Sequence, residues 1–64
     1  MTIRPIQTSD GWEILEWSAN GGTYPLPGGM IVKTATKESA NDLCFMVAEQ
    51  LGSLGFRVEL EQVE

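Results

Sequence analysis

The side chains that could do chemistry in this 64-residue chain are nine carboxylates and one thiol, because histidine is absent. Histidine is the most frequent general base in enzymes, and without it Cys44 has no partner to lower its pKa and activate it. Opposed carboxylates could act as acid and base, but they need a substrate cleft larger than so short a chain encloses. We therefore expect a protein that is not an enzyme and has no catalytic residues.

The same residue types argue against a bound metal or cofactor. Zinc sites need histidine or paired cysteine ligands, and calcium loops need closely spaced Asp and Asn residues before a glycine. The chain has neither pattern. Two short segments, Asn20-Gly21-Gly22 and Pro27-Gly28-Gly29, lack the lysine and the spacing of a phosphate-binding loop and indicate turns instead. We expect no cofactor and no metal site.

The excess of carboxylates is better suited to binding a basic partner. If residues 37–54 form a helix, Glu38, Asp42 and Glu49 fall on one side of it, with the ring of Phe45 among them. An aromatic ring there would fill a pocket of the partner while the carboxylates meet its Lys or Arg side chains. The alternative is that Phe45 folds back over the edge of the sheet or under a long loop.

A second acidic row lies near the C-terminus. Glu59 and Glu61 project from the same face of a predicted strand, about 6.7 Å apart. Rows of carboxylates can occupy the lysines and arginines that otherwise hold nucleic-acid phosphates. The predicted partner-binding residues are therefore Glu38, Asp42, Phe45, Glu49, Glu59 and Glu61. The alternative is that the acidic surface only keeps the protein soluble.

These side chains must be positioned by a helix and several strands. Thr36 can cap a helix over residues 37–54, and Gly55 suits the left-handed position that follows a helix end. The apolar stripe that would face a sheet consists of Ala40, Leu43, Val47, Leu51 and Leu54, with Cys44 and Met46 on its flanks.

Alternation of apolar and polar residues predicts the strands. Residues 56–63 alternate through Leu60, which places Phe56, Val58 and Leu60 inward. Residues 12–17 predict a central strand, whose imperfect alternation indicates either burial on parts of both faces or a bulge. A turn at residues 9–11 would join it to a first strand over residues 3–7, where Pro5 indicates an edge. A short strand over residues 30–34 precedes the helix.

The remaining segment, residues 18–29, is rich in glycine and proline and predicts a long exposed loop. The chain then forms a single domain over residues 1–64 of the α+β class. One helix packs on a small, mainly antiparallel sheet in the order β-β-β-α-β. Because one apolar helix stripe matches one inward strand face, we expect a monomer when the protein is free.

Charge and cysteine content limit the partners and the compartment. A net charge of −5 and a pI near 4.4 argue against direct binding to nucleic acid or to an anionic membrane. No apolar stretch is long enough to cross a membrane. A single cysteine cannot form an intramolecular disulfide, and this favours the cytoplasm for so small a domain.

In size, acidity and compactness the chain resembles the anti-CRISPR proteins of phages and mobile elements, many of which are small acidic single domains. This resemblance rests on size and charge, without a shared motif. It implies an inhibitor that binds a CRISPR effector complex and obstructs its basic DNA-binding surface by mimicking DNA, in the bacterial cytoplasm if the gene is carried by a phage. The alternative is a small structural or adaptor module whose Tyr24–Gly29 loop docks on another protein.

Overall fold

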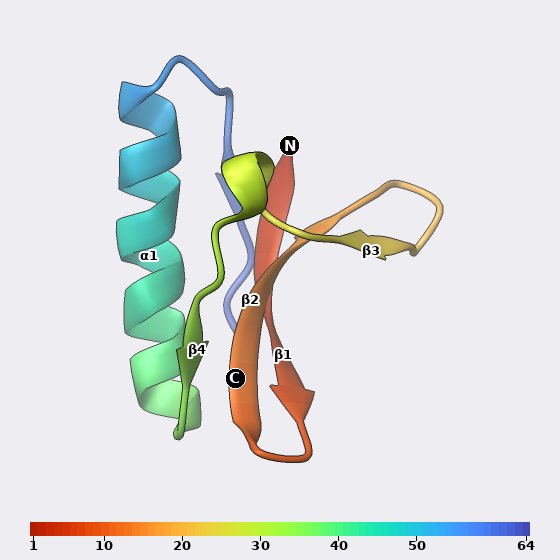
Figure 1. Ribbon diagram of the computed structural model, residues 1–64, viewed down its shortest axis with the longest axis vertical. Coiled ribbons are helices and arrows are strands. Elements are labelled where there is room, and N and C mark those ends of the chain that lie inside the picture. The colour runs from red at the N-terminus through yellow and green to blue at the C-terminus, as the bar shows by residue number, and fades with distance from the viewer.

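The computed structural model describes residues 1–64 as two layers, a five-stranded sheet with one helix packed along one of its faces (Figure 1). The elements in chain order are β1 (Thr2–Thr8), β2 (Gly11–Trp17), β3 (Thr23–Tyr24), the 3₁₀ helix η1 (Pro27–Gly29), β4 (Lys33–Thr34), α1 (Lys37–Ser53) and β5 (Glu59–Leu60). The predicted α+β class and mainly antiparallel sheet are confirmed. One more strand precedes the helix than predicted, because β3 forms inside the segment expected to be a loop.

The β1–β2 hairpin is the frame of the sheet. Its register runs without interruption from Thr2 opposite Trp17 to Thr8 opposite Gly11, so β2 has no bulge. The imperfect alternation of β2 therefore means apolar side chains on both faces of the strand. As predicted, β2 is central, since it pairs with β1 on one side and with both β3 and β4 on the other.

At Gly11 the backbone of this hairpin lies close to the end of β4. Its φ is +139°, and a Cβ added to it would lie 2.5 Å from the backbone oxygen of Thr34. Only glycine therefore fits there without moving the backbone.

The last strand is shorter than predicted and runs parallel to β1. It pairs with β1 only at Thr2 and Ile3, where the N–H groups of Glu59 and Glu61 donate to the carbonyls of Met1 and Ile3. Beyond Ile3 no strand borders β1 on that side. Pro5 lies in this free half of β1, in agreement with the edge position predicted for it, and its missing N–H costs no ladder hydrogen bond.

Both ends of α1 are built as the sequence predicts. Thr36 caps the N-terminus, where its Oγ1 accepts a hydrogen bond from the Ser39 N–H at 3.2 Å. At the other end Gly55 has φ +98°, and its N–H donates to Gly52 O. The Phe56 N–H donates to Leu51 O, which completes a Schellman motif.

The core lies between α1 and the sheet. Its buried apolar residues are Ile3, Ile14, Leu26, Ala40, Cys44, Val47 and Leu51. The helical stripe therefore runs through Cys44, which was predicted only as a flank. Leu43 is partly buried and lies outside this cluster, and Leu54 is 68% exposed because it is the C-cap, where the chain leaves the helical path. The prediction that both belong to the core was wrong.

Two other predictions about burial were also wrong. Leu26 lies in the segment expected to be an exposed loop, yet it is only 2% exposed and belongs to the core. Phe56, expected to point inward, is exposed, because the left-handed turn at Gly55 redirects the chain and the strand begins only at Glu59. Val58 and Leu60 pack against the core as predicted. None of the helices combines the length and the apolar character needed to cross a membrane.

Candidate functional site

The outer face of α1 carries three exposed carboxylates in one row, Glu38, Asp42 and Glu49, here called the acidic row. At 100° per residue Phe45 lies on one side of this row and Met46 on the other. Phe45 is 51% exposed and Met46 is 60% exposed. The ring of Phe45 therefore points into solvent, as the partner-binding hypothesis requires, and Met46 adds a second apolar contact that the sequence analysis assigned to the flank of the core.

The acidic row has no basic partner within the molecule, whose one ion pair joins Arg4 and Glu61. The position of Glu38 in the first helical turn is favourable, because the helix dipole stabilises negative charge there. Asp42 lies four residues from Glu38, where like charges repel. Glu49 lies toward the negative end of the helix, and the last turn has no basic residue. The charges of Asp42 and Glu49 thus slightly disfavour this helix.

The second predicted row, Glu59 and Glu61, lies on a different face of the molecule. Both side chains are exposed, but they alternate with inward residues of the C-terminal segment and point away from α1. Glu61 Oε2 lies 3.9 Å from Nη1 of Arg4, whose guanidinium lies 4.9 Å from the centroid of the Trp17 ring. The six predicted residues therefore form two separate groups, and one flat partner surface cannot contact both.

The sheet face turned away from α1, which we call the open face, carries Glu59, Glu61 and further side chains that the sequence analysis did not single out. Partly exposed apolar side chains on it are Ile6, Leu15 and Trp17, none of which packs against the core. The uninterrupted register places Leu15 opposite Arg4, and Trp17 opposite Thr2. The adjacent pair Ile14-Leu15 was the available signal, because two consecutive apolar residues in one strand must point to opposite faces.

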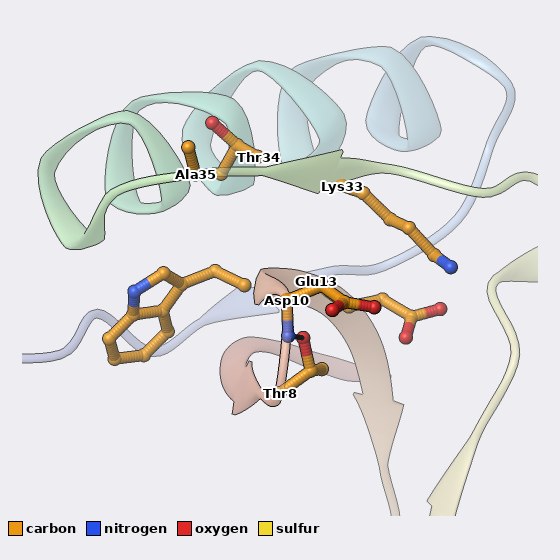
Figure 2. Close-up of a pocket in the computed structure, with 7 residues that line it drawn as sticks. Thr8, Asp10, Glu13, Lys33, Thr34 and Ala35 are labelled. Atoms are coloured by element: carbon orange, nitrogen blue, oxygen red, sulfur yellow. Dashed lines mark hydrogen bonds between the residues drawn. The ribbon is translucent and has the colours of Figure 1, made fainter.

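A shallow pocket lies beside the β1–β2 turn, where β2 pairs with β4 (Figure 2). Its volume is about 330 Å³, and it is lined by Thr8, Asp10, Trp12, Glu13, Lys33, Thr34 and Ala35. The Asp10 N–H donates to Oγ1 of Thr8 at 3.3 Å. The pocket thus presents two carboxylates and one ammonium group. No three His, Cys, Asp or Glu side chains of the molecule lie close enough together to hold a metal ion.

Cys44 is fully buried and lies at the centre of the helical stripe, although the sequence analysis placed it on the flank. Burial raises the pKa of its thiol to about 11. Its Sγ donates to the Glu61 carbonyl at 3.8 Å. A protonated, enclosed thiol is a poor nucleophile at neutral pH, so Cys44 serves packing.

Asn41 holds the C-terminal segment against α1, a role that sequence reasoning missed. Its Nδ2 donates to Val63 O at 2.7 Å, and its Oδ1 accepts from the Val63 N–H at 2.9 Å. The side-chain amide thus replaces a neighbouring strand for one residue of the tail. Gln62 adds a hydrogen bond from its Nε2 to the Asn41 carbonyl at 3.3 Å. These bonds fix residues 61–64 beside the first half of the helix.

The outer face of α1 thus unites unpaired charge and exposed apolar side chains on one rigid element. Comparisons with protein-family models, with curated proteins and with solved structures found no match for this chain.

Proposed function

We propose that this protein is a non-enzymatic inhibitor, which binds through the outer face of α1 to the basic surface of a nucleic-acid-binding protein. The observation that supports this proposal most is the unpaired acidic row with Phe45 and Met46 exposed beside it. The carboxylates would meet Lys or Arg side chains that otherwise contact phosphates, and the bound inhibitor would exclude nucleic acid from them.

The spacing of the row defines what kind of mimic it can be. Along the helix Glu38 and Asp42 are about 6 Å apart, and Asp42 and Glu49 about 10 Å apart, at 1.5 Å per residue. Duplex DNA carries a charge about every 1.7 Å, so the row is much sparser than the polymer it would displace. Phe45 and Met46 must therefore contribute part of the affinity by filling apolar hollows between the basic side chains.

The resemblance to anti-CRISPR proteins gives this proposal its most specific form. The partner would then be a CRISPR effector complex, and the inhibited step would be the binding of target DNA in its basic channel. This places the proposed action in the cytoplasm of a bacterial cell. A rigid helix can present its side chains there without an ordering cost, which favours binding by a domain with so small a contact surface.

The alternative, an adaptor that docks through the Tyr24–Gly29 loop, is less well supported by the structure. Leu26, the apolar centre of that loop, lies in the core and cannot contact another protein. Tyr24 is half exposed, but it pairs through β3 with the central strand. The loop thus offers one exposed aromatic side chain, whereas α1 offers two apolar side chains and three carboxylates.

The proposal can be tested by measuring DNA binding to purified CRISPR effector complexes of different types in the presence of the protein. One double variant, Asp42→Asn with Glu49→Gln, removes two charges from the acidic row. A matched control, Glu59→Gln with Glu61→Gln, removes two charges from the other face. We expect wild type and the control to inhibit DNA binding to one of the complexes. The α1 variant should reach the same inhibition only at a concentration at least about tenfold higher.

Two results would contradict the proposal. If no effector loses DNA binding in the presence of the wild-type protein, the anti-CRISPR form of the proposal is wrong. If the two double variants inhibit equally, the binding face is not α1.

A further inference from the structure

The open face, which α1 leaves uncovered, is the second surface of this molecule that can bind a macromolecule. Figure 1 shows α1 along one side of the β1–β2 hairpin, with no second helix on the other side. Ile6 and Leu15 lie near the middle of the uncovered side and Trp17 toward one end, as the register of β1 and β2 dictates. These three side chains are only partly buried and pack against no part of the core. One apolar side chain of β1 and two of β2 thus line the uncovered side of the hairpin.

The charges on the open face differ from those on α1, because both signs occur. Arg4 and Glu61 form an ion pair beside Trp17 on the β1–β5 side of the face, where Glu59 adds a second carboxylate. Glu13 and Lys33 lie opposite each other in the register of β2 and β4, on the other side of the face. The Arg4–Glu61 pair and the Glu13–Lys33 pair thus flank the apolar strip on opposite sides, since Arg4 lies opposite Leu15 and Glu13 lies opposite Ile6.

We propose that the open face binds a second copy of this chain in an isologous, face-to-face dimer. The twofold axis of such a dimer lies between the two faces and is perpendicular to the line that joins the two charge pairs. It brings the Arg4–Glu61 pair of one copy against the Lys33–Glu13 pair of the other. Each cation then faces a carboxylate, and Leu15 meets the apolar strip of the second copy near the axis. A nucleic acid or a uniformly basic protein would match only one of the two signs on this face.

The size of the face sets the strength of this dimer. The two largest extents of the molecule, 30 and 24 Å, limit a flat face to about 700 Å². A standard interface takes about 800 Å² from each partner, so the contact would use the whole open face. We therefore expect a weak, reversible dimer whose formation depends on protein concentration.

A dimer through the open face differs from the monomer expected from the sequence and leaves the proposed function intact. The sequence predicted a single apolar face on the sheet, turned inward, and the monomer was expected because no second apolar face was left to bind another copy. The uninterrupted β2 register gives the strand apolar side chains on both faces. Because α1 lies on the opposite side of the sheet, the acidic row of each copy remains exposed to partners in such a dimer.

The test is sedimentation equilibrium over a range of about 1–500 μM, combined with two-dimensional NMR of the backbone amides over the same range. Leu15→Glu places a charge in the centre of the face. Lys33→Glu places a carboxylate against Glu61 of the second copy, so that the two like charges repel. Met46→Glu is the matched control, since it makes the same kind of substitution on the outer face of α1. Far-UV circular dichroism checks the fold of each variant.

We expect wild type and Met46→Glu to reach a dimer mass, and the amides of β1 and β2 to shift with concentration. Leu15→Glu and Lys33→Glu should dimerise at least tenfold more weakly. If Leu15→Glu does not fold, Lys33→Glu still tests the proposal, because the side chain of Lys33 is exposed and its replacement leaves the core unchanged. A wild-type mass that stays monomeric at every concentration would overturn the proposal. Dimerisation of both open-face variants like wild type, or amide shifts confined to α1, would also overturn it.

Discussion

Leu26→Ala should remove a large part of the stability of this domain. Leu26 is 2% exposed and belongs to the core cluster, although it comes from the glycine- and proline-rich segment between β2 and β4. Truncating a buried leucine costs about 2–5 kcal/mol, through lost transfer free energy and the cavity that remains. At about 0.05–0.15 kcal/mol per residue, a domain of this length has about 3–10 kcal/mol in total. The variant should therefore lose about half of its unfolding free energy.

Leu54→Ala is the matched control, because it makes the same truncation at a leucine that is 68% exposed. Its cost should stay within about 0.5 kcal/mol. Urea denaturation followed by circular dichroism gives both values, provided that the slope with denaturant is unchanged. Burial would be assigned wrongly if Leu54→Ala proved the more destabilising of the two, or if Leu26→Ala unfolded at the wild-type urea concentration.

Three further predictions concern single groups of the fold. Asn41→Ala should cost about 1–2 kcal/mol and speed up hydrogen exchange at the Val63 amide, since both hydrogen bonds to Val63 are lost; unchanged exchange would mean that the tail is held in another way. Cys44 should react with a thiol reagent at pH 8 only after unfolding. Because burial raises the pKa of its thiol from 9.0 to about 11, the unfolded chain ionises first, and stability should fall as the pH rises across that window; a flat pH dependence of the melting temperature there would contradict this. Gly11→Ala should destabilise more than Gly28→Ala, because a Cβ at Gly28 meets no atom within 4 Å whereas one at Gly11 meets the Thr34 carbonyl oxygen; equal melting temperatures would refute the close approach.

Local signals in the sequence were sufficient to predict the helix and the hairpin. Thr36 and Gly55 mark the ends of α1 through hydrogen bonds within a few residues, so no distant part of the chain is needed to place them. The same holds for the turn between β1 and β2, which two residues form. For the candidate site, this was enough to place Glu38, Asp42 and Phe45 together on the outer face of one helix.

What the sequence could not give depends on contacts between distant segments. Leu26 is buried because β3 and η1 carry it back over the core, and no local pattern encodes that path. The parallel pairing of β5 with β1 joins the two ends of the chain and turns the side chains of Glu59 and Glu61 away from α1. No residue near Glu59 or Glu61 in the sequence signals this pairing. The open face was missed because alternation in β2 fails once apolar residues occupy both faces of a strand.

The most direct test of the proposed function is competition with nucleic acid for a single basic surface. Labelled wild-type protein is titrated with an effector complex that it inhibits. The titration is done first without DNA and then in the presence of increasing concentrations of target DNA. We predict that the apparent dissociation constant rises linearly with the free DNA concentration, and that Phe45→Ala weakens binding to the empty complex without changing the fold. Equal affinity for the empty and the DNA-filled complex would contradict it.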